Sequence, residues 1–288
     1  MKKIGVIDYF FDEAHASVFP DCIKKASDGE YVCAYGYAAV ETPREGGVTN
    51  AEWCEKNGVE LCASIEEVVE KSDVLVVLAP DFPAEKEELC RLPLASGKPC
   101  YVDKTLAPDR ETAERIFRYA ADHNTPTWSS SGLSFAPTLK ELDIDHDTIL
   151  GISAWGPAWG GGIGYEIYAI HQIDPIMTLI DAEPTEVMID TAKGKWYTMI
   201  IRFDDGRAAS ISGFVEGMSP FMLNLSLTGG NKVLNISSGY NDVFYREMVE
   251  FFEDKQPKIP HSVTCRTIAA VEAGLRALET PGKWVPVK

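Results

Sequence analysis

The chain has 288 residues, of which 45% are hydrophobic and 25% charged, which is the composition of a globular protein long enough to form two hydrophobic cores. The formal net charge is -17, so the surface would repel a phosphate backbone, and we expect no nucleic-acid partner. No apolar run reaches the roughly 18 to 20 residues that a membrane helix needs, which predicts that the chain has no membrane partner.

The first half of the sequence alternates strand-like and helix-like segments. Helices are expected near residues 13–27, 49–57, 64–71, 83–96 and 109–123, the third opened by the capping-box pattern of Ser64 and Glu67. Strands are expected at residues 2–8, 31–35, 73–79 and 98–103, and again from Pro126. Such alternation is typical of parallel strands joined by right-handed crossovers. Residues 1–130 are therefore predicted to form a Rossmann-type, doubly wound parallel sheet, giving an α/β fold class.

The second half changes character. Strand-like runs follow one another without intervening helices, at residues 185–192, 196–203, 207–215, 222–228 and 231–236. Two closing helices are expected at residues 241–254 and 262–279. This order predicts an antiparallel meander, so residues 131–288 are expected to form an α+β domain with a large, mostly antiparallel open sheet.

The cysteines indicate a reducing compartment. They are odd in number, spread along the chain and never spaced as C-x-x-C: Cys22, Cys33, Cys54, Cys62, Cys90, Cys100 and Cys265. We therefore expect a cytoplasmic protein with free thiols and no metal site.

Several short features occur in the order found in one enzyme family. They are His15 in the first helix, the turn Ala79-Pro80-Asp81, the segment Gly97-Lys98-Pro99 leading to Asp103-Lys104-Thr105, the glycines 160–162 before His171-Gln172-Ile173-Asp174, and the final helix with residues 269–273. In this order the chain resembles the Gfo/Idh/MocA family of sugar and polyol dehydrogenases over nearly its whole length. The resemblance implies a dinucleotide-binding domain, a substrate domain, and a homodimer or homotetramer formed through the C-terminal sheet.

The resemblance also assigns catalytic roles. Lys104 falls on the family's catalytic lysine and directly follows an expected strand, at the edge where open α/β sheets bind ligands. His171 would accept the proton of a substrate hydroxyl, because histidine does this near neutral pH. Asp174 lies three residues further along the same helical face and would orient the His171 ring or bind substrate hydroxyls.

Cofactor and substrate contacts are implied in the same way. The implied cofactor is NAD or NADP, and its expected contacts are Ile7, Asp8, Tyr9, Phe10, Ala79, Pro80, Asp81 and Asp103. Trp159 and Glu166 are expected to contact a small-molecule substrate, since an aromatic face suits a sugar ring. Glu166 stands near the position of a family aspartate, five residues before His171, so a regular helix would point it away from that ring.

One segment departs from the family pattern. A dinucleotide fold uses G-x-G-x-x-G after its first strand, but residues 8–13 read Asp-Tyr-Phe-Phe-Asp-Glu. Residues 35–38, Tyr-Gly-Tyr-Ala, also lack the acid that would hold the adenosine ribose. Two interpretations therefore stay open: an NAD(P)-dependent oxidoreductase of a sugar, polyol or related hydroxy compound, or a non-redox descendant that binds a small metabolite or acts as a regulatory protein. The sequence identifies neither the substrate nor the nicotinamide cofactor.

Overall fold

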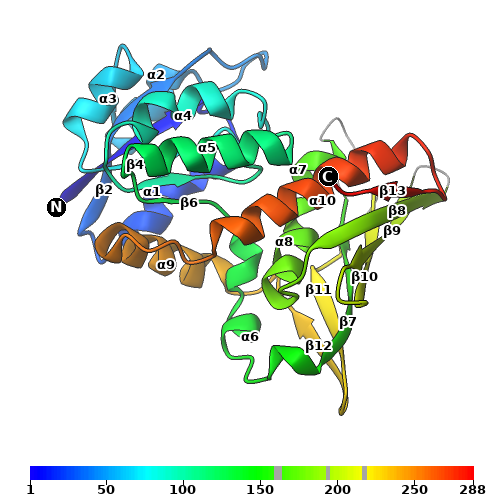
Figure 1. Ribbon diagram of the computed structural model, residues 1–288. Helices are drawn as coiled ribbons and strands as arrows, with labels where there is room; N and C mark the ends of the chain where they lie inside the picture. Colours follow the sequence, from blue (N-terminus) through cyan, green and yellow to red (C-terminus); the bar gives the residue numbers. More distant parts are fainter. Residues whose placement is uncertain (159–163, 193–194, 216–218) are drawn as a thin grey trace. The chain divides into compact units, whose positions relative to one another are not determined.

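The computed structural model describes residues 1–158, 164–192, 195–215 and 219–288 (Figure 1). Its contacts divide the chain into two compact units. The first unit comprises residues 1–107, 114–129 and 244–261, and the second comprises residues 108–113, 130–243 and 262–288. Along the chain, the first unit thus gives way to the second between Ser129 and Ser130.

A six-stranded parallel sheet forms the centre of the first unit. Its strand order is β3-β2-β1-β4-β5-β6, with all pairs parallel. The strands are β1 (Lys2–Asp8), β2 (Tyr31–Ala38), β3 (Glu60–Leu61), β4 (Val74–Val77), β5 (Cys100–Val102) and β6 (Thr127–Trp128). All four side chains of β4 are buried, as expected for a strand covered on both faces. The predicted doubly wound sheet is confirmed.

Helices cover both faces of this sheet. They are α1 (Ala14–Ala26), α2 (Asn50–Asn57), α3 (Ile65–Lys71), α4 (Lys86–Leu94), α5 (Arg110–Asp122) and the returning helix α9 (Tyr240–Asp254). Helices α3, α4 and α5 lie on one face, whereas α1 and α9 lie on the other (Figure 1). Phe244 and Phe251 of α9 pack against Trp128, which is fully buried, so this late segment completes the first core.

Helix caps in the first unit differ in one detail from the sequence prediction. The Ser64 side chain accepts a hydrogen bond from Glu67 N, as expected, but the Glu67 carboxylate accepts from Ala63 N. The complete capping box belongs instead to α2, where Thr49 and Glu52 satisfy each other's backbone N–H groups.

The second unit contains a seven-stranded sheet in the order β12-β11-β7-β10-β9-β8-β13. Its strands are β7 (Ile149–Pro157), β8 (Pro184–Ala192), β9 (Trp196–Phe203), β10 (Ala208–Phe214), β11 (Met222–Leu227), β12 (Gly230–Asn235) and β13 (Trp284–Pro286). The predicted open, mostly antiparallel sheet is confirmed, but it is not a simple meander. Strand β10 pairs in parallel with β7, and β11 pairs with the other edge of β7 instead of with β10.

Short helices and one long helix accompany this sheet. The second unit holds the 3-10 helices η1 (Gly132–Phe135) and η2 (His146–Thr148), and the α-helices α6 (Pro137–Lys140), α7 (Tyr165–Tyr168), α8 (Ile170–Leu179) and, apart from its first residue, α10 (His261–Leu278). Most residues of α8 and α10 are buried, so these helices supply much of the second core. Among the helices of the described residues, none combines the length and apolar character that crossing a membrane requires.

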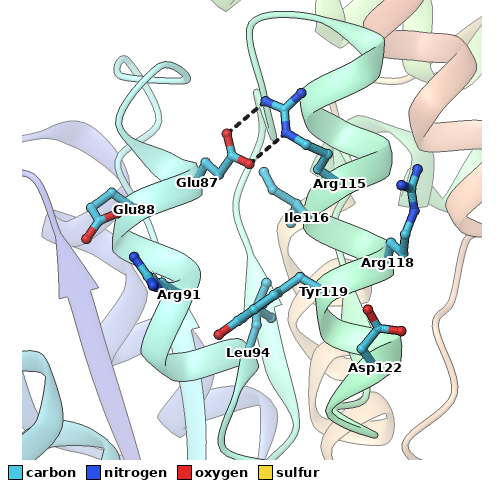
Figure 2. Close-up of a pocket in the computed structure, with 9 residues that line it drawn as sticks. All are labelled: Glu87, Glu88, Arg91, Leu94, Arg115, Ile116, Arg118, Tyr119 and Asp122. Carbon is cyan, nitrogen blue, oxygen red and sulfur yellow. Dashed lines mark hydrogen bonds and ion pairs between the residues drawn. The ribbon is translucent and has the colours of Figure 1, made fainter.

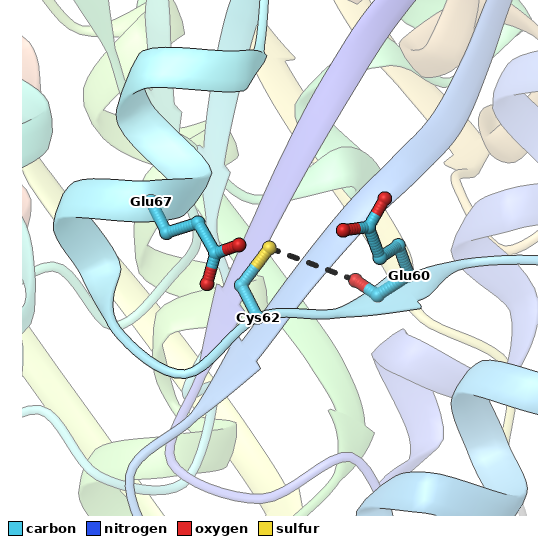
Figure 3. A group of neighbouring side chains, drawn as sticks. All are labelled: Glu60, Cys62 and Glu67. Atoms are coloured by element: carbon cyan, nitrogen blue, oxygen red, sulfur yellow. Dashed lines mark hydrogen bonds between the residues drawn. The ribbon is translucent and has the colours of Figure 1, made fainter.

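Two surface features of the first unit lie outside the region discussed below. A pocket of about 450 Å³ lies between α4 and α5, with the paired Glu87 and Arg115 at one end (Figure 2). In the second feature, possible metal-binding atoms of Glu60, Cys62 and Glu67 lie within 4.8 Å of one another (Figure 3). The Lys71 ammonium already donates to the carboxylates of Glu60 and Glu67, at 2.6 and 2.5 Å, so one cation is present beside them without a metal ion.

Candidate active site

The loop after β5 carries Lys104, and its backbone is hydrogen-bonded to a second, buried lysine. Lys86, in the first turn of α4, has no exposed surface, and its ammonium donates to the carbonyls of Asp103, Lys104 and Thr105 at 2.5, 2.9 and 2.9 Å. Burial lowers the pKa of Lys86 to about 8. Three successive carbonyls aimed at one cation fix the backbone of the loop, and the Lys104 side chain is only 4% exposed.

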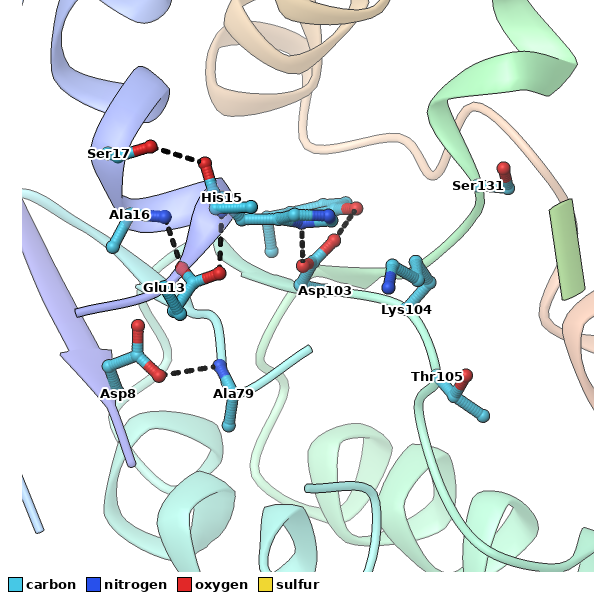
Figure 4. Close-up of polar contacts among 12 residues, drawn as sticks. Asp8, Glu13, His15, Ala16, Ser17, Ala79, Asp103, Lys104, Thr105 and Ser131 are labelled. Atoms are coloured by element: carbon cyan, nitrogen blue, oxygen red, sulfur yellow. Dashed lines mark hydrogen bonds and ion pairs between the residues drawn. The ribbon is translucent and has the colours of Figure 1, made fainter. Parts of the chain in front are cut away.

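Asp103 lies beside Lys104 and forms a pair with His15 of α1 (Figure 4). Its carboxylate is 2.5 Å from His15 Nδ1 and accepts from the Tyr101 hydroxyl at 3.1 Å. Burial alone would raise the pKa of Asp103, but the charge and hydrogen bond of His15, with Lys86 and Lys104, outweigh burial and lower that pKa. Asp103 is therefore ionised and holds His15 at the carboxyl end of the sheet.

The turn after β1 buries two further carboxyl groups. Glu13 is the N-cap of α1, and its carboxylate accepts from His15 N at 2.6 Å and from Ala16 N. Asp8 Oδ1 accepts from Tyr9 N and from Ala79 N, at 2.7 and 3.0 Å (Figure 4). Ala79 has a positive φ of 50°, a conformation that residues other than glycine seldom adopt. Burial and, for Asp8, the nearby charge of Glu13 raise the pKa of both groups.

The aromatic residues of this turn pack inside the first unit. Phe11 stacks on Trp53 of α2, with ring centroids 4.2 Å apart, and has no exposed surface. Tyr9 and Phe10 gather on Phe82, with centroid distances of 4.3 and 5.4 Å. All three rings thus pack against other aromatic rings of the first unit, and their side chains fill the turn where glycines would leave it open.

The turn as it stands does not fit a pyrophosphate. In dinucleotide-binding α/β folds the pyrophosphate lies on the N–H groups that begin the first helix. Here the Glu13 carboxylate takes those donors on α1, and two like charges about 4 Å apart would repel each other by about 1 to 4 kcal/mol. The N–H groups of His15 and Ala16 are therefore not available to the pyrophosphate of a nicotinamide cofactor while Glu13 accepts from them.

The remaining residues implied as cofactor contacts are placed differently. The Ile7 side chain is fully buried within β1, so only its backbone is available to a ligand. Pro80 is buried and Asp81 is exposed, in the turn that follows β4.

In the second unit, His171 is linked to Asp174 through a serine. The Ser131 hydroxyl is 2.9 Å from His171 Nδ1, and Ser131 N donates to Asp174 at 2.9 Å. Asp174 also accepts from the Ser134 and Thr267 hydroxyls, at 2.7 and 3.2 Å. Asp174 thus accepts hydrogen bonds from Ser131, Ser134 and Thr267, and it positions Ser131, whose hydroxyl contacts the imidazole.

The substrate contacts expected before His171 are only partly visible. Trp159 and the glycines 160–162 lie outside the described residues. Glu166 is in α7, which ends before α8 begins, so Glu166 and His171 do not share one regular helix. Its carboxylate folds back over Gly164, in the space where a Cβ at that position would lie.

No role is predicted from the sequence for Lys86, Glu13 or Ser131. Lys86 had a signal, because it precedes the buried Leu89 and Cys90 by three and four residues and so shares their helical face. Ser131 lies in the serine run of residues 129–131, which carries no pattern that distinguishes a ring partner.

Asp174 gives the second unit a predicted pH dependence. Burial raises the pKa of Asp174 to about 6 despite its three donors, from 3.8 for the free side chain. Between pH 3.8 and about 6 the folded state therefore binds more protons than the unfolded state. The contribution of Asp174 to the free energy of unfolding is fully present below pH about 4 and falls by about 3 kcal/mol as the pH rises through about 6. We expect Asp174→Asn to flatten this fall in denaturant unfolding between pH 4 and 7. The exposed Asp81→Asn is the control, and equal pH slopes in wild type and Asp174→Asn would contradict the assignment.

The comparisons with known proteins concern the fold. No protein-family model matches the sequence, and no curated protein does. Solved structures match over the whole chain. The myo-inositol dehydrogenase of Lactobacillus casei in complex with NAD(H) and myo-inositol has a TM-score of 0.82 at 14% identity, covering 100% of this chain and 97% of that one. The apo scyllo-inositol dehydrogenase of the same species has a TM-score of 0.80 at 14% identity, covering 100% and 98%. A probable dehydrogenase of Thermotoga maritima has a TM-score of 0.78 at 15% identity, covering 99% and 98%.

The chain has the fold of these dehydrogenases. The fold that the family resemblance implied is therefore confirmed for both units.

Proposed function

We propose that the chain is an oxidoreductase acting on the hydroxyl group of a sugar, a polyol such as an inositol, or a related compound. NAD or NADP is the hydride acceptor that the solved neighbours suggest, since the neighbouring myo-inositol dehydrogenase was solved with NAD(H). The observation that carries the proposal is the Lys104 loop, which lies at the carboxyl end of a parallel sheet and is fixed by three hydrogen bonds from Lys86.

Lys104 would bind the reacting oxygen. An ammonium that is 4% exposed and held on a fixed loop can donate a hydrogen bond to a hydroxyl or carbonyl oxygen without first being ordered. Asp103 beside it is ionised, because His15, Lys86 and Lys104 lower the pKa of its carboxyl group.

His171 would accept the hydroxyl proton. The Ser131 hydroxyl lies 2.9 Å from its Nδ1, a contact that orients the imidazole ring. Asp174 acts as a positioning residue, because it fixes the backbone of Ser131 and so the orientation of the ring.

The test is a titration of the purified protein with NADH and NADPH by calorimetry, followed by a screen of inositols and sugars for reduction of NAD and NADP. Binding together with reduction by one substrate class would support the proposal. Absence of binding at millimolar nucleotide, together with no reduction, would contradict it.

The second candidate function is a non-redox protein that binds a small metabolite or regulates a partner. The observation in its favour is the turn of residues 8–13, where Glu13 takes the phosphate donors and the aromatic rings are packed away. Under this alternative, sugars or inositols would bind in calorimetry in the absence of any nucleotide, and no reduction would be observed.

We also propose a cytoplasmic homodimer or homotetramer formed through the outer face of the second-unit sheet. Met188 and Ile200 lie opposite each other on that face and are half-exposed, and Trp196 is 43% exposed, whereas the other face is buried. We expect Ile200→Lys to lower the particle mass in gel filtration with light scattering, while Leu92→Lys, on α4 of the first unit, leaves it unchanged. A monomeric wild type would contradict this interface.

A further inference from the structure

The N-terminal end of α1 is occupied by the protein's own carboxylate. Glu13 accepts hydrogen bonds from the N–H groups of the second and third residues of the helix, His15 N and Ala16 N, and is itself only 7% exposed. Ser, Thr, Asp and Asn are the usual N-cap residues, because their short side chains reach these donors directly. Glu13 caps α1 with a longer side chain, and a change of its side-chain rotamer would remove the carboxylate from the helix N–H groups.

A second carboxyl group at the same turn, that of Asp8, has one oxygen without a hydrogen-bond partner among the described residues. Asp8 is buried, and its Oδ1 is bonded to Tyr9 N and Ala79 N, but its Oδ2 has no hydrogen-bond partner among the described residues. Asp103, the third acid of this group, is balanced by His15. The hydrogen bonds of Asp8 and Glu13 go to backbone N–H groups, so the turn places two acid side chains and one unsatisfied oxygen where the fold would bind an anion.

Three of the four buried residues at this turn also correspond in spacing to the three glycines of the dinucleotide motif. Asp8, Phe10 and Glu13 follow the pattern G-x-G-x-x-G at its first, third and sixth positions, and they are 1%, 6% and 7% exposed. The space that glycines would leave open is thus filled by side chains, and the N–H groups at the start of α1 are bonded to the Glu13 carboxylate.

We propose that Glu13 is an internal competitor of the nucleotide, which binds to α1 only when the Glu13 side chain withdraws from the helix N-terminus. This inference rests on the proposed function, because it concerns the same cofactor. It identifies Glu13 as a residue that determines both the affinity and the selectivity of the site for phosphate-bearing ligands. If the withdrawn form makes up about 1 to 10% of the free protein, the apparent affinity of wild type falls by about 10- to 100-fold.

The experiment measures NADH, NADPH and inorganic pyrophosphate binding by calorimetry to wild type, Glu13→Ser and Glu13→Gln. Serine is a good N-cap that keeps α1 capped and leaves the donors accessible, whereas glutamine keeps the length and removes the charge. Glu52→Gln is the matched control, since it removes the same charge from the first turn of the neighbouring helix α2. Thermal unfolding of each variant shows whether it folds, and Glu13→Gln carries the test if Glu13→Ser does not.

We expect Glu13→Ser to bind NADH about 10- to 100-fold more tightly than wild type, Glu13→Gln to lie between them, and Glu52→Gln to equal wild type. Pyrophosphate should follow the same order, because the effect lies at the phosphates. If only the Glu13 variants bind nucleotide, the inference holds and the proposed function of the wild-type protein fails. If wild type binds NADH as tightly as the variants, the inference fails and the proposed function stands. If no variant binds any of the three probes, both fail.

Discussion

Replacement of Lys104 by alanine is expected to lower kcat/KM by about 10²- to 10⁴-fold with the substrate that the screen identifies. The side chain is buried beside Asp103 at the carboxyl end of β5, so its loss removes a preorganised donor to the reacting oxygen. Lys104→Arg should not restore the rate, because a planar guanidinium cannot take the position of a compact ammonium at 4% exposure.

The measurement is steady-state kinetics of wild type and both variants, with thermal unfolding to show that the variants are folded. Lys56→Ala is the control, since Lys56 is an exposed lysine near the end of α2. A Lys104→Ala protein within a few-fold of wild type would show that the resemblance has assigned the role to the wrong lysine.

The parallel sheet could be predicted because its signals are local. The buried runs of β1 and β4, separated by helix-like segments, fix both the strand type and the crossover hand. The seven-stranded sheet could be predicted only in outline. Strand β7, with two glycines among its nine residues, was not predicted as a strand, and its parallel pairing with β10 joins segments about 50 residues apart. No local pattern encodes such a partner.

Some residues of the candidate site could likewise be predicted from the sequence, and others could not. Lys104 and His171 were found through motifs, because their neighbours in sequence carry the resemblance. Glu13, Lys86 and Ser131 were not, because each acts on backbone or side-chain atoms that only the fold brings to it. The absent glycines could be seen in the sequence. That Glu13 would cap α1 in their place could not, since N-cap preferences favour shorter polar residues.

Lys86→Met is expected to lower both the stability and the activity of the protein, because Lys86 holds the backbone of the loop that carries Lys104. Methionine removes the cation that bonds the carbonyls of Asp103, Lys104 and Thr105, and leaves three buried acceptors without their donor. We expect a loss of about 2 to 4 kcal/mol in the free energy of unfolding, since breaking a buried charged contact on one side is strongly destabilising. Lys86→Arg should be no better, because the site is fully enclosed around a smaller head group.

A pH series separates this role from a general packing defect. Burial lowers the pKa of Lys86 to about 8 in the folded protein, against 10.5 for the free side chain. Between these values the unfolded state binds more protons than the folded state, so wild type should gain about 3 kcal/mol of stability as the pH rises from 8 to 10.5. That gain should be missing from Lys86→Met, in denaturant unfolding at matched ionic strength.

The same variant links stability to the proposed chemistry. If Lys86 positions Lys104, then kcat of Lys86→Met should fall at temperatures where the protein is still folded, and KM should change less, because the substrate oxygen loses its aligned donor while other contacts remain. A variant that loses stability but keeps kcat would show that the three carbonyl bonds support the fold alone. Lys104 would then be held in place by its own packing beside Asp103, and the loop would not depend on the cation beneath it.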